Sequence, residues 1–179
     1  MLDGRTIISL LCATWLAAGC SISYRNDGRT GQRAPEIIHH PLPDNSTFPI
    51  ARAVEVISDV RTLYHSGLTP RPADDSAERG TRAYWGDTEA QARSVLGRIS
   101  ESLDGFGYSL GDVTKMTVFL VGDPELGGRM DFDGFMRAYT ELYGATAERS
   151  LPARSAVQVA GLVAPGMWVE IEVIAVRAR

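Results

Sequence analysis

Residues 168–176 read WVEIEVIAV, and residues 152–159 read PARSAVQV. In both runs apolar side chains recur at every second position, the pattern of a β-strand, because successive side chains point to opposite faces of a sheet. We expect the two strands to form a hairpin with its turn near Leu162–Pro165. That hairpin would place Arg154 almost opposite the stretch Glu170–Glu172, on the same face of the sheet.

Two amphipathic helices are expected upstream of these strands. Thr88 and Gln91 match a capping box, and an apolar stripe at helical spacing follows them as far as Gly105. A second stripe begins near Asp131 and stops at Gly144. It consists mostly of aromatic residues, which we interpret as core packing: Phe132, Phe135, Met136, Tyr139, Leu142 and Tyr143.

The remaining strands complete a two-layer arrangement. Residues 112–121 form a β-branched and aromatic run typical of a buried strand, and residues 35–42 suggest a short edge strand. Residues 52–57 and 61–67 alternate around a small turn, which predicts a hairpin, and residues 68–85 have the composition of a loop or insertion. The fold class expected is α+β, a two-layer sandwich with a mixed β-sheet packed on two helices.

The composition excludes several classes of function. The net charge is −4 in 179 residues, so the overall charge balance does not indicate a nucleic-acid-binding face, and a local cluster of arginines is the remaining alternative. Both cysteines, Cys12 and Cys20, lie in the first twenty residues, which leaves the rest without a disulfide, a thiol nucleophile or a cysteine-ligated metal. His39 and His40 are adjacent in a strand and point to opposite faces, so they do not suggest a joint metal site.

The N-terminus has the pattern of a processing signal. Residues 6–16 are mostly apolar but too few to span a bilayer, and small residues precede Cys20. The order LAAGC resembles the lipobox of bacterial lipoproteins, in which the cysteine is lipidated; the alternative is a plain signal peptide that contains a cysteine. We therefore expect a signal peptide over residues 1–19, a flexible tether over 20–34 and a domain over 35–179. The resemblance implies a lipid-anchored periplasmic protein, with Ser21 suggesting the outer membrane.

Arg154 and Glu170 are the candidate catalytic pair. A guanidinium presents a rigid fork of donors that matches a carboxylate, and a glutamate can exchange a proton with water or a leaving nitrogen. The alternative is an ordinary salt bridge between neighbouring strands. Trp85 has two alternative roles: it packs within the domain, or it stacks on a ligand.

Several segments resemble the RidA/YjgF family. Residues 152–159 are similar to its PARS-x-V-x-V segment, and residues 168–176 to its VEIEAIAV ending. Residues 91–120 and 135–143 resemble its two helices and the strand between them, and residues 63–67 resemble its L-Y-x-S-G strand end. The resemblance runs from about residue 36 to the end of the chain.

The resemblance implies a chorismate-mutase-like trimer with ligand clefts between subunits. It implies hydrolysis of reactive 2-imino or enamine acids to 2-keto acids and ammonia, without a cofactor or metal. Arg154 would hold the substrate carboxylate, Glu170 would position water, and the backbone at Gly67, beside Ser66, and at Ala156 would add hydrogen bonds.

Three positions depart from the family pattern. Ile50 follows Pro49 where the family often has an aromatic residue, Met136 replaces an asparagine, and Ala156 replaces a common cysteine. A non-catalytic envelope protein that binds small carboxylates is therefore the alternative. An endoribonuclease, described for some relatives, ranks last because an acidic exported chain is poorly suited to RNA.

Overall fold

The computed structural model describes residues 36–57, 59–144 and 150–179, which belong to one compact unit, Gln32–Arg179. The predicted signal peptide, Cys20 and the tether lie outside the described residues. None of the helices in the described ranges has the length and apolar character needed to cross a bilayer.

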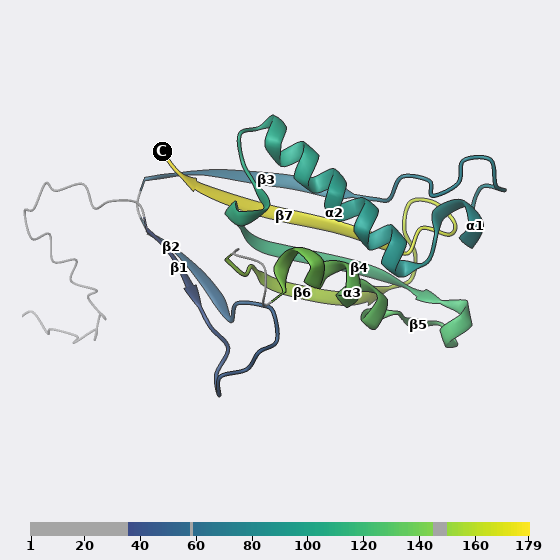
Figure 1. Cartoon of the computed structure of the whole chain (residues 1–179), viewed down its shortest axis with the longest axis horizontal. Coiled ribbons are helices and arrows are strands. Elements are labelled where there is room, and N and C mark those ends of the chain that lie inside the picture. Colours follow the sequence, from purple (N-terminus) through teal and green to yellow (C-terminus); the bar gives the residue numbers. More distant parts are fainter. Residues whose placement is uncertain (1–35, 58, 145–149) are drawn as a thin grey trace, which may run out of the picture. The chain divides into compact units, whose positions relative to one another are not determined.

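A mixed sheet forms one layer (Figure 1). β3 (Val60–Leu68), β7 (Val169–Ala178) and β4 (Val113–Asp123) lie side by side and are antiparallel. On its other edge β4 pairs in parallel with β6 (Ala153–Val159). The last two residues of β4 also pair with the short antiparallel strand β5 (Arg129–Met130).

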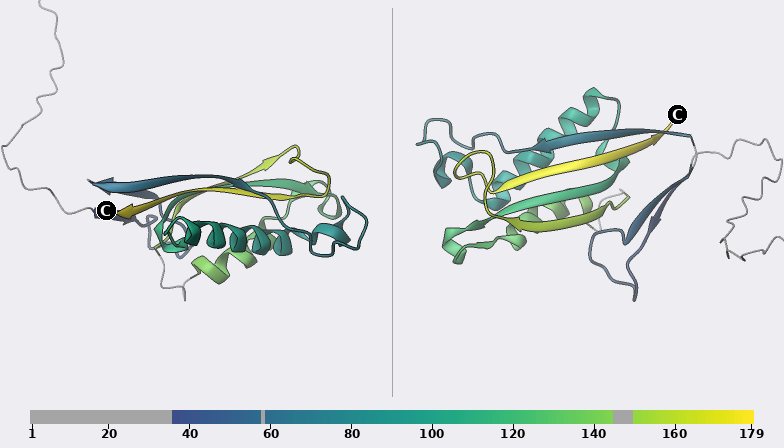
Figure 2. Two further views of the ribbon diagram at one scale, coloured as in Figure 1. Left: turned by 90° about the horizontal axis from the view of Figure 1, so that it is seen from above. Right: turned by 180° about the vertical axis from the view of Figure 1, so that it is seen from behind.

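Two helices form the second layer. α2 (Thr88–Gly105) and α3 (Phe132–Tyr143) lie on the same side of the sheet, as the left view of Figure 2 shows. Two short 3-10 turns, η1 (Leu110–Asp112) and η2 (Pro124–Leu126), precede and follow β4. The predicted two-layer α+β sandwich is confirmed.

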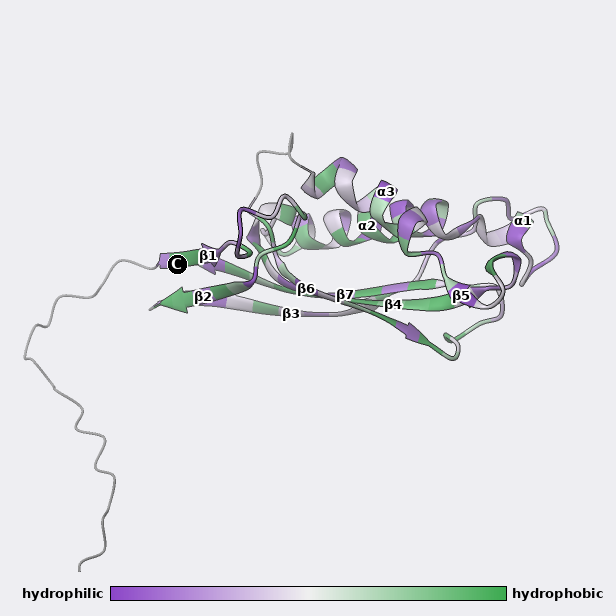
Figure 3. Ribbon diagram, turned by 90° about the horizontal axis from the view of Figure 1, so that it is seen from below, coloured by the Kyte–Doolittle hydropathy of each residue, from purple (hydrophilic) through white to green (hydrophobic). Residues whose placement is uncertain are grey.

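The core fills the space between these layers. Apolar residues recur along both helices and along β4 and β7 (Figure 3), because every second strand residue and one stripe of each helix face inward. Leu96 and Ile99 of α2 are fully buried against strand residues such as Val118 and Ile171. The other face of the sheet carries no helix of the described chain.

The cap of α2 differs from the prediction. Asp87 is the N-cap, and its side chain accepts a hydrogen bond from the Ala90 amide at 2.8 Å. The buried Gln91 amide instead donates to the Gly86 and Gly166 carbonyls and accepts from the Trp168 amide. Gln91 therefore joins the start of α2 to the start of β7, a long-range role that its spacing from Thr88 does not reveal.

The predicted hairpin of residues 52–57 and 61–67 is wrong. β2 (Ala53–Ile57) pairs with β1 (Glu36–His40) in a separate two-stranded sheet, whereas β3 pairs with β7. The insertion of residues 68–85 ends in a short helix, α1 (Arg82–Trp85). Trp85 is buried there and donates from Nε1 to the Pro165 carbonyl at 2.9 Å, so it packs the insertion against the connection between β6 and β7.

The hairpin predicted from residues 152–159 and 168–176 is also wrong. β4 lies between β6 and β7 and pairs with both, so the two strands do not contact each other as neighbours (Figure 1). The connection between them crosses the end of β4 instead of forming a tight turn. This change of strand order separates the two residues on which the predicted site depends.

Candidate functional site

Arg154 lies near the start of β6 and points toward the helices. It is paired with Met116, which faces the core. Its guanidinium is surrounded by aromatic rings and a thioether: Nη2 donates to the Met136 sulfur at 3.2 Å. The distances from Cζ to the ring centroids are 4.1 Å for Tyr139, 5.1 Å for Phe135, 5.5 Å for Phe48 and 5.9 Å for Phe132.

No acidic side chain in the described part of the chain neutralises the charge of Arg154. Nη1 is buried and has no hydrogen-bond partner among the described residues. Burial lowers the pKa of Arg154, and the Tyr139 hydroxyl acts in the opposite direction; no carboxylate contributes. Burial likewise raises the pKa of Tyr139 to about 12, so this phenol is neutral at physiological pH. A desolvated cation gains about 2 kcal/mol from contact with an aromatic face, but such contacts do not supply the negative charge that a carboxylate would.

The segment before β2 covers this guanidinium. The Tyr139 hydroxyl donates to the Pro49 carbonyl at 2.9 Å, and the Ala51 amide donates to the Pro152 carbonyl at 3.0 Å. These bonds hold residues 48–51 between α3 and β6. Phe48 is thereby placed against Arg154 while 40% of its surface stays exposed.

Glu170 lies on the opposite face of the sheet. The register places Arg154, Met116 and Val173 in one row across β6, β4 and β7, and paired residues share a face. Glu170 is three residues from Val173, so it points the other way, to the face that carries no helix. The prediction that Arg154 and Glu170 share one face of the sheet is wrong for a single chain.

The Glu170 carboxylate lies over Gly67. A Cβ atom on Gly67 would collide with Oε1 of Glu170. The pairing of β3 with β7 shifts register between His65 and Leu68, so Ser66 and Gly67 form a bulge. Bulges re-aim backbone groups and are common beside active sites.

The five predicted site residues therefore fall into two groups. Arg154 and Ala156 lie on the helix-facing side of β6, at the edge of the sheet. Ser66, Gly67 and Glu170 lie together on β3 and β7. The structure brings together the members of each group but not the two groups.

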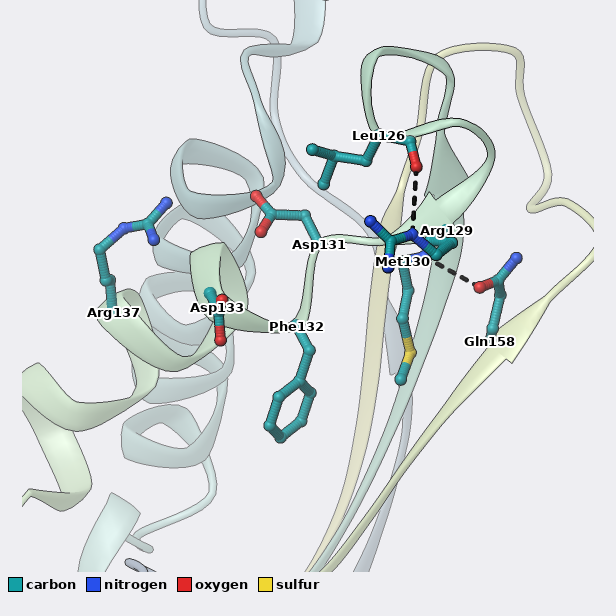
Figure 4. Close-up of a pocket in the computed structure, with 8 residues that line it drawn as sticks. All are labelled: Leu126, Arg129, Met130, Asp131, Phe132, Asp133, Arg137 and Gln158. Atoms are coloured by element: carbon teal, nitrogen blue, oxygen red, sulfur yellow. Dashed lines mark hydrogen bonds between the residues drawn. The ribbon is translucent and has the colours of Figure 1, made fainter.

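A cavity of about 530 Å³ opens near the end of β6 (Figure 4). Its charged side chains come from β5 and the start of α3, and Gln158 comes from β6. Most of its polar groups already have partners: Arg137 pairs with Glu89, Asp131 caps α3, and Gln158 bonds the Met130 amide and the Gly128 carbonyl. Phe132 lines this cavity and also contacts Arg154.

The histidines have ordinary partners. His39 donates from Nδ1 to the Leu151 carbonyl at 2.8 Å, and His40 contacts the Glu55 carboxylate at 3.2 Å. His65 bonds the Ser66 carbonyl and the Ser102 hydroxyl. Within the described ranges, no three His, Cys, Asp or Glu side chains cluster in a way that could hold a metal.

The aromatic surroundings of Arg154 were not predicted as part of the site. Phe135, Tyr139 and Met136 appeared in the sequence as a helical stripe, and a stripe of this kind is usually core packing. Phe48 lies in a segment without periodicity. The one available signal was its position just before Pro49, close to where the family often has an aromatic residue.

Comparisons with known proteins agree with this fold. The model of the family described as Endoribonuclease L-PSP matches residues 44–177. The RutC family protein PH0854 of Pyrococcus horikoshii is 39% identical over 133 residues, 74% of this chain and 92% of that protein. The 2-iminobutanoate/2-iminopropanoate deaminase of Escherichia coli K12 is 34% identical over 93 residues, 51% of this chain and 65% of that enzyme.

Solved structures give the same result. The protein of unknown function PA3499 from Pseudomonas aeruginosa is 30% identical, with a TM-score of 0.52 over 79% of this chain and 92% of that one. E. coli TdcF, solved with bound serine, is 28% identical, with a TM-score of 0.51 over 74% of this chain and 97% of that one.

Proposed function

Because the chain belongs to the YjgF/RidA family, we propose that it hydrolyses 2-imino acids, or their enamine tautomers, to 2-keto acids and ammonia. The observation that carries this proposal is the guanidinium of Arg154, which is largely buried and has neither a hydrogen-bond partner for Nη1 nor a carboxylate partner among the described residues. Burying a cation without a counterion is costly. An anionic ligand that completes the hydrogen bonds of Arg154 would offset this cost.

Arg154 holds the substrate carboxylate. The guanidinium can donate two parallel hydrogen bonds to a carboxylate, which fixes both its position and its orientation. The rings around Arg154 exclude water and strengthen this attraction. The imine carbon next to the carboxylate is thereby held in one place for attack.

Glu170 positions the attacking water. Its carboxylate accepts a proton as the water oxygen bonds to the imine carbon, and it returns a proton to the nitrogen as the carbon–nitrogen bond breaks. The iminium acid and water thus give the keto acid and ammonium. No cofactor enters this sequence, because the imine is already activated by protonation.

A complete site needs two chains. Arg154 and Glu170 point away from opposite faces of one sheet, so one substrate cannot contact both within a chain. Arg154 lies on β6 at one edge, whereas the Gly67 bulge lies on β3 at the other. We propose that Arg154 and Ala156 of one subunit face Ser66, Gly67 and Glu170 of another in a homotrimer.

A second function has its own supporting observation. Met136 occupies the position of a family asparagine, and its sulfur accepts from Nη2 of Arg154. A thioether is a weak acceptor that cannot orient a water molecule or an imine nitrogen as an amide can. A protein that binds small carboxylates without turnover would keep Arg154 and tolerate this change.

The test is conversion of 2-aminoacrylate by the purified full chain, followed as pyruvate and ammonia. Release above the uncatalysed rate that disappears in Arg154→Ala and Glu170→Gln supports the hydrolase. Calorimetry with pyruvate and serine addresses the alternative. Tight binding without turnover favours the binding protein, and a wild-type rate equal to the background excludes the hydrolase.

A further inference from the structure

An apolar cavity of about 260 Å³ shares a wall with the Arg154 site. It lies between the segment that joins β1 to β2 and the residues just before β6. The shared wall is Phe48, which lines the cavity and lies 5.5 Å from Cζ of Arg154. Ala51, also in the lining, forms a bridge with Ala153, the residue next to Arg154.

Three of the four polar side chains around this cavity, all except Thr47, have partners in the structure. His39 donates to the Leu151 carbonyl, and His40 pairs with Glu55. The Ser46 hydroxyl accepts from the Phe48 amide at 3.3 Å. The rest of the lining is mainly carbon, contributed by Pro41, Leu42, Phe48, Ile50, Ala51 and Leu151. The cavity therefore favours an apolar occupant.

Its size suits part of a ligand. Pockets that hold a whole small molecule usually enclose about 300–1,000 Å³, and this cavity falls below that range. A methyl group would leave most of it empty, whereas an isobutyl or benzyl group would remove much more apolar surface from water.

We propose that the cavity is a specificity subsite for a large apolar side group. The ligand carboxylate binds Arg154, and its branched or aromatic side group enters the cavity past Phe48, against Ile50, Leu42 and Leu151. The preferred substrates are then 2-imino acids with the carbon skeletons of leucine or phenylalanine, not of alanine. This inference rests on the proposed function for the position of the carboxylate.

The experiment compares imines made in situ by an amino-acid oxidase from leucine and from alanine. We expect kcat/KM to be at least about tenfold higher for the leucine-derived imine, because one buried methylene alone is worth about 10-fold or more in such a pocket. Ile50→Phe narrows the cavity and should reduce or reverse this ratio. Val163→Phe, in the exposed connection between β6 and β7, is the matched control and should leave it unchanged.

The outcomes separate the subsite from the reaction. A higher kcat/KM for the alanine-derived imine, or equal loss on both imines in an Ile50→Phe protein with native circular dichroism, overturns the subsite. If neither imine is turned over, the proposed reaction fails, and calorimetry then tests the cavity alone. Tighter binding of 4-methyl-2-oxopentanoate than of pyruvate supports it, whereas equal binding, the reverse order or no binding overturns it.

Discussion

The carboxylate of Glu170 lies so close to Gly67 that no side chain fits between them. Gly67 is part of the β3 bulge, and Glu170 comes from the neighbouring β7. Both face away from the helices, and Arg154 does not. The glycine is therefore required for the position of the acid and not for an unusual backbone angle.

Gly67→Ala should lower activity without unfolding the protein. The new Cβ meets the far end of a flexible side chain, so Glu170 can move aside at small cost to stability. A displacement of about 1 Å in a reacting group can reduce the rate about 10²-fold. We expect a loss of that order in kcat for imine hydrolysis, with an unchanged far-ultraviolet circular dichroism spectrum.

Gly97→Ala is the matched control. Gly97 lies within α2, and a Cβ there meets no atom within 4 Å. Alanine favours a helix by about 1 kcal/mol over glycine, so this variant should be slightly more stable and fully active. Equal activity of Gly67→Ala and Gly97→Ala would contradict the role given to Gly67.

Arg154→Met should abolish ligand binding and increase the stability of the fold. The substitution removes a largely buried cation whose Nη1 has no partner among the described residues, and it leaves an apolar side chain among Phe48, Phe135 and Tyr139. We expect ligand binding to disappear and the free energy of unfolding to rise by about 1 kcal/mol, measured by urea denaturation. Arg79→Met, at an exposed position, should change neither. A clearly less stable Arg154→Met protein would contradict the assignment of Arg154 as an uncompensated charge.

The buried phenol of Tyr139 should make the fold less stable at high pH. Burial raises the pKa of Tyr139 from 10.0 to about 12. Between these values the unfolded chain loses the phenol proton and the folded chain keeps it, so stability falls as pH rises from 10 to about 12 and is unaffected by this group below 10. The free energies of unfolding of wild type and Tyr139→Phe, measured by urea denaturation, should follow the same pH dependence below pH 10. Above pH 10 the wild type should lose additional stability, on the order of 2 kcal/mol at pH 12. Parallel curves would disprove this.

The uncovered face of the sheet should be an interface. Val157 and Tyr64 point to this face and are 44% and 77% exposed. A charge among apolar side chains disfavours association, so Val157→Asp should dissociate the assembly and reduce activity together. Sedimentation velocity measures the mass. Val163→Asp, in the connection between β6 and β7, should keep the wild-type mass, and an unchanged mass for Val157→Asp would count against the proposed trimer.

Cys20 should carry the lipid. We propose that residues 1–19 are removed and that the cysteine anchors the protein in the cell envelope. In bacterial expression, metabolic labelling with a palmitate analogue should mark the wild type but not Cys20→Ser. Cys12→Ser is the control and should still be labelled, because Cys12 lies within the predicted signal peptide. A labelled Cys20→Ser protein would contradict the proposal.

The fold was largely predictable because its signals are local. The stripes of α2 and α3 and the alternation of residues 153–159 and 168–176 reflect which side chains are buried. Strand order is not local. Nothing within the last two strands shows that β4, more than thirty residues earlier than β6, lies between them. The prediction of which residues share a face within each strand was therefore right. The prediction of which residues share a face between the two strands was wrong, because it assumed a hairpin.

The sequence identified residues of the candidate site but not how they are arranged in space. Resemblance to known motifs identified Arg154 and Glu170, and their alternation predicted strands. Phe48 and Tyr139 reach Arg154 through tertiary contacts that have no fixed spacing in the sequence. A site divided between two faces of a sheet also has no signature within one chain, and we propose that a second copy completes it.

The most direct test of the divided site is complementation between two inactive variants. Arg154→Ala and Glu170→Ala are refolded alone and as an equal mixture, and imine hydrolysis is measured. If each site takes Arg154 from one subunit and Glu170 from another, random mixing restores intact sites and about a quarter of the wild-type activity. Activity of the mixture no greater than that of the separate variants, with wild type refolding to full activity, would contradict a site shared between chains.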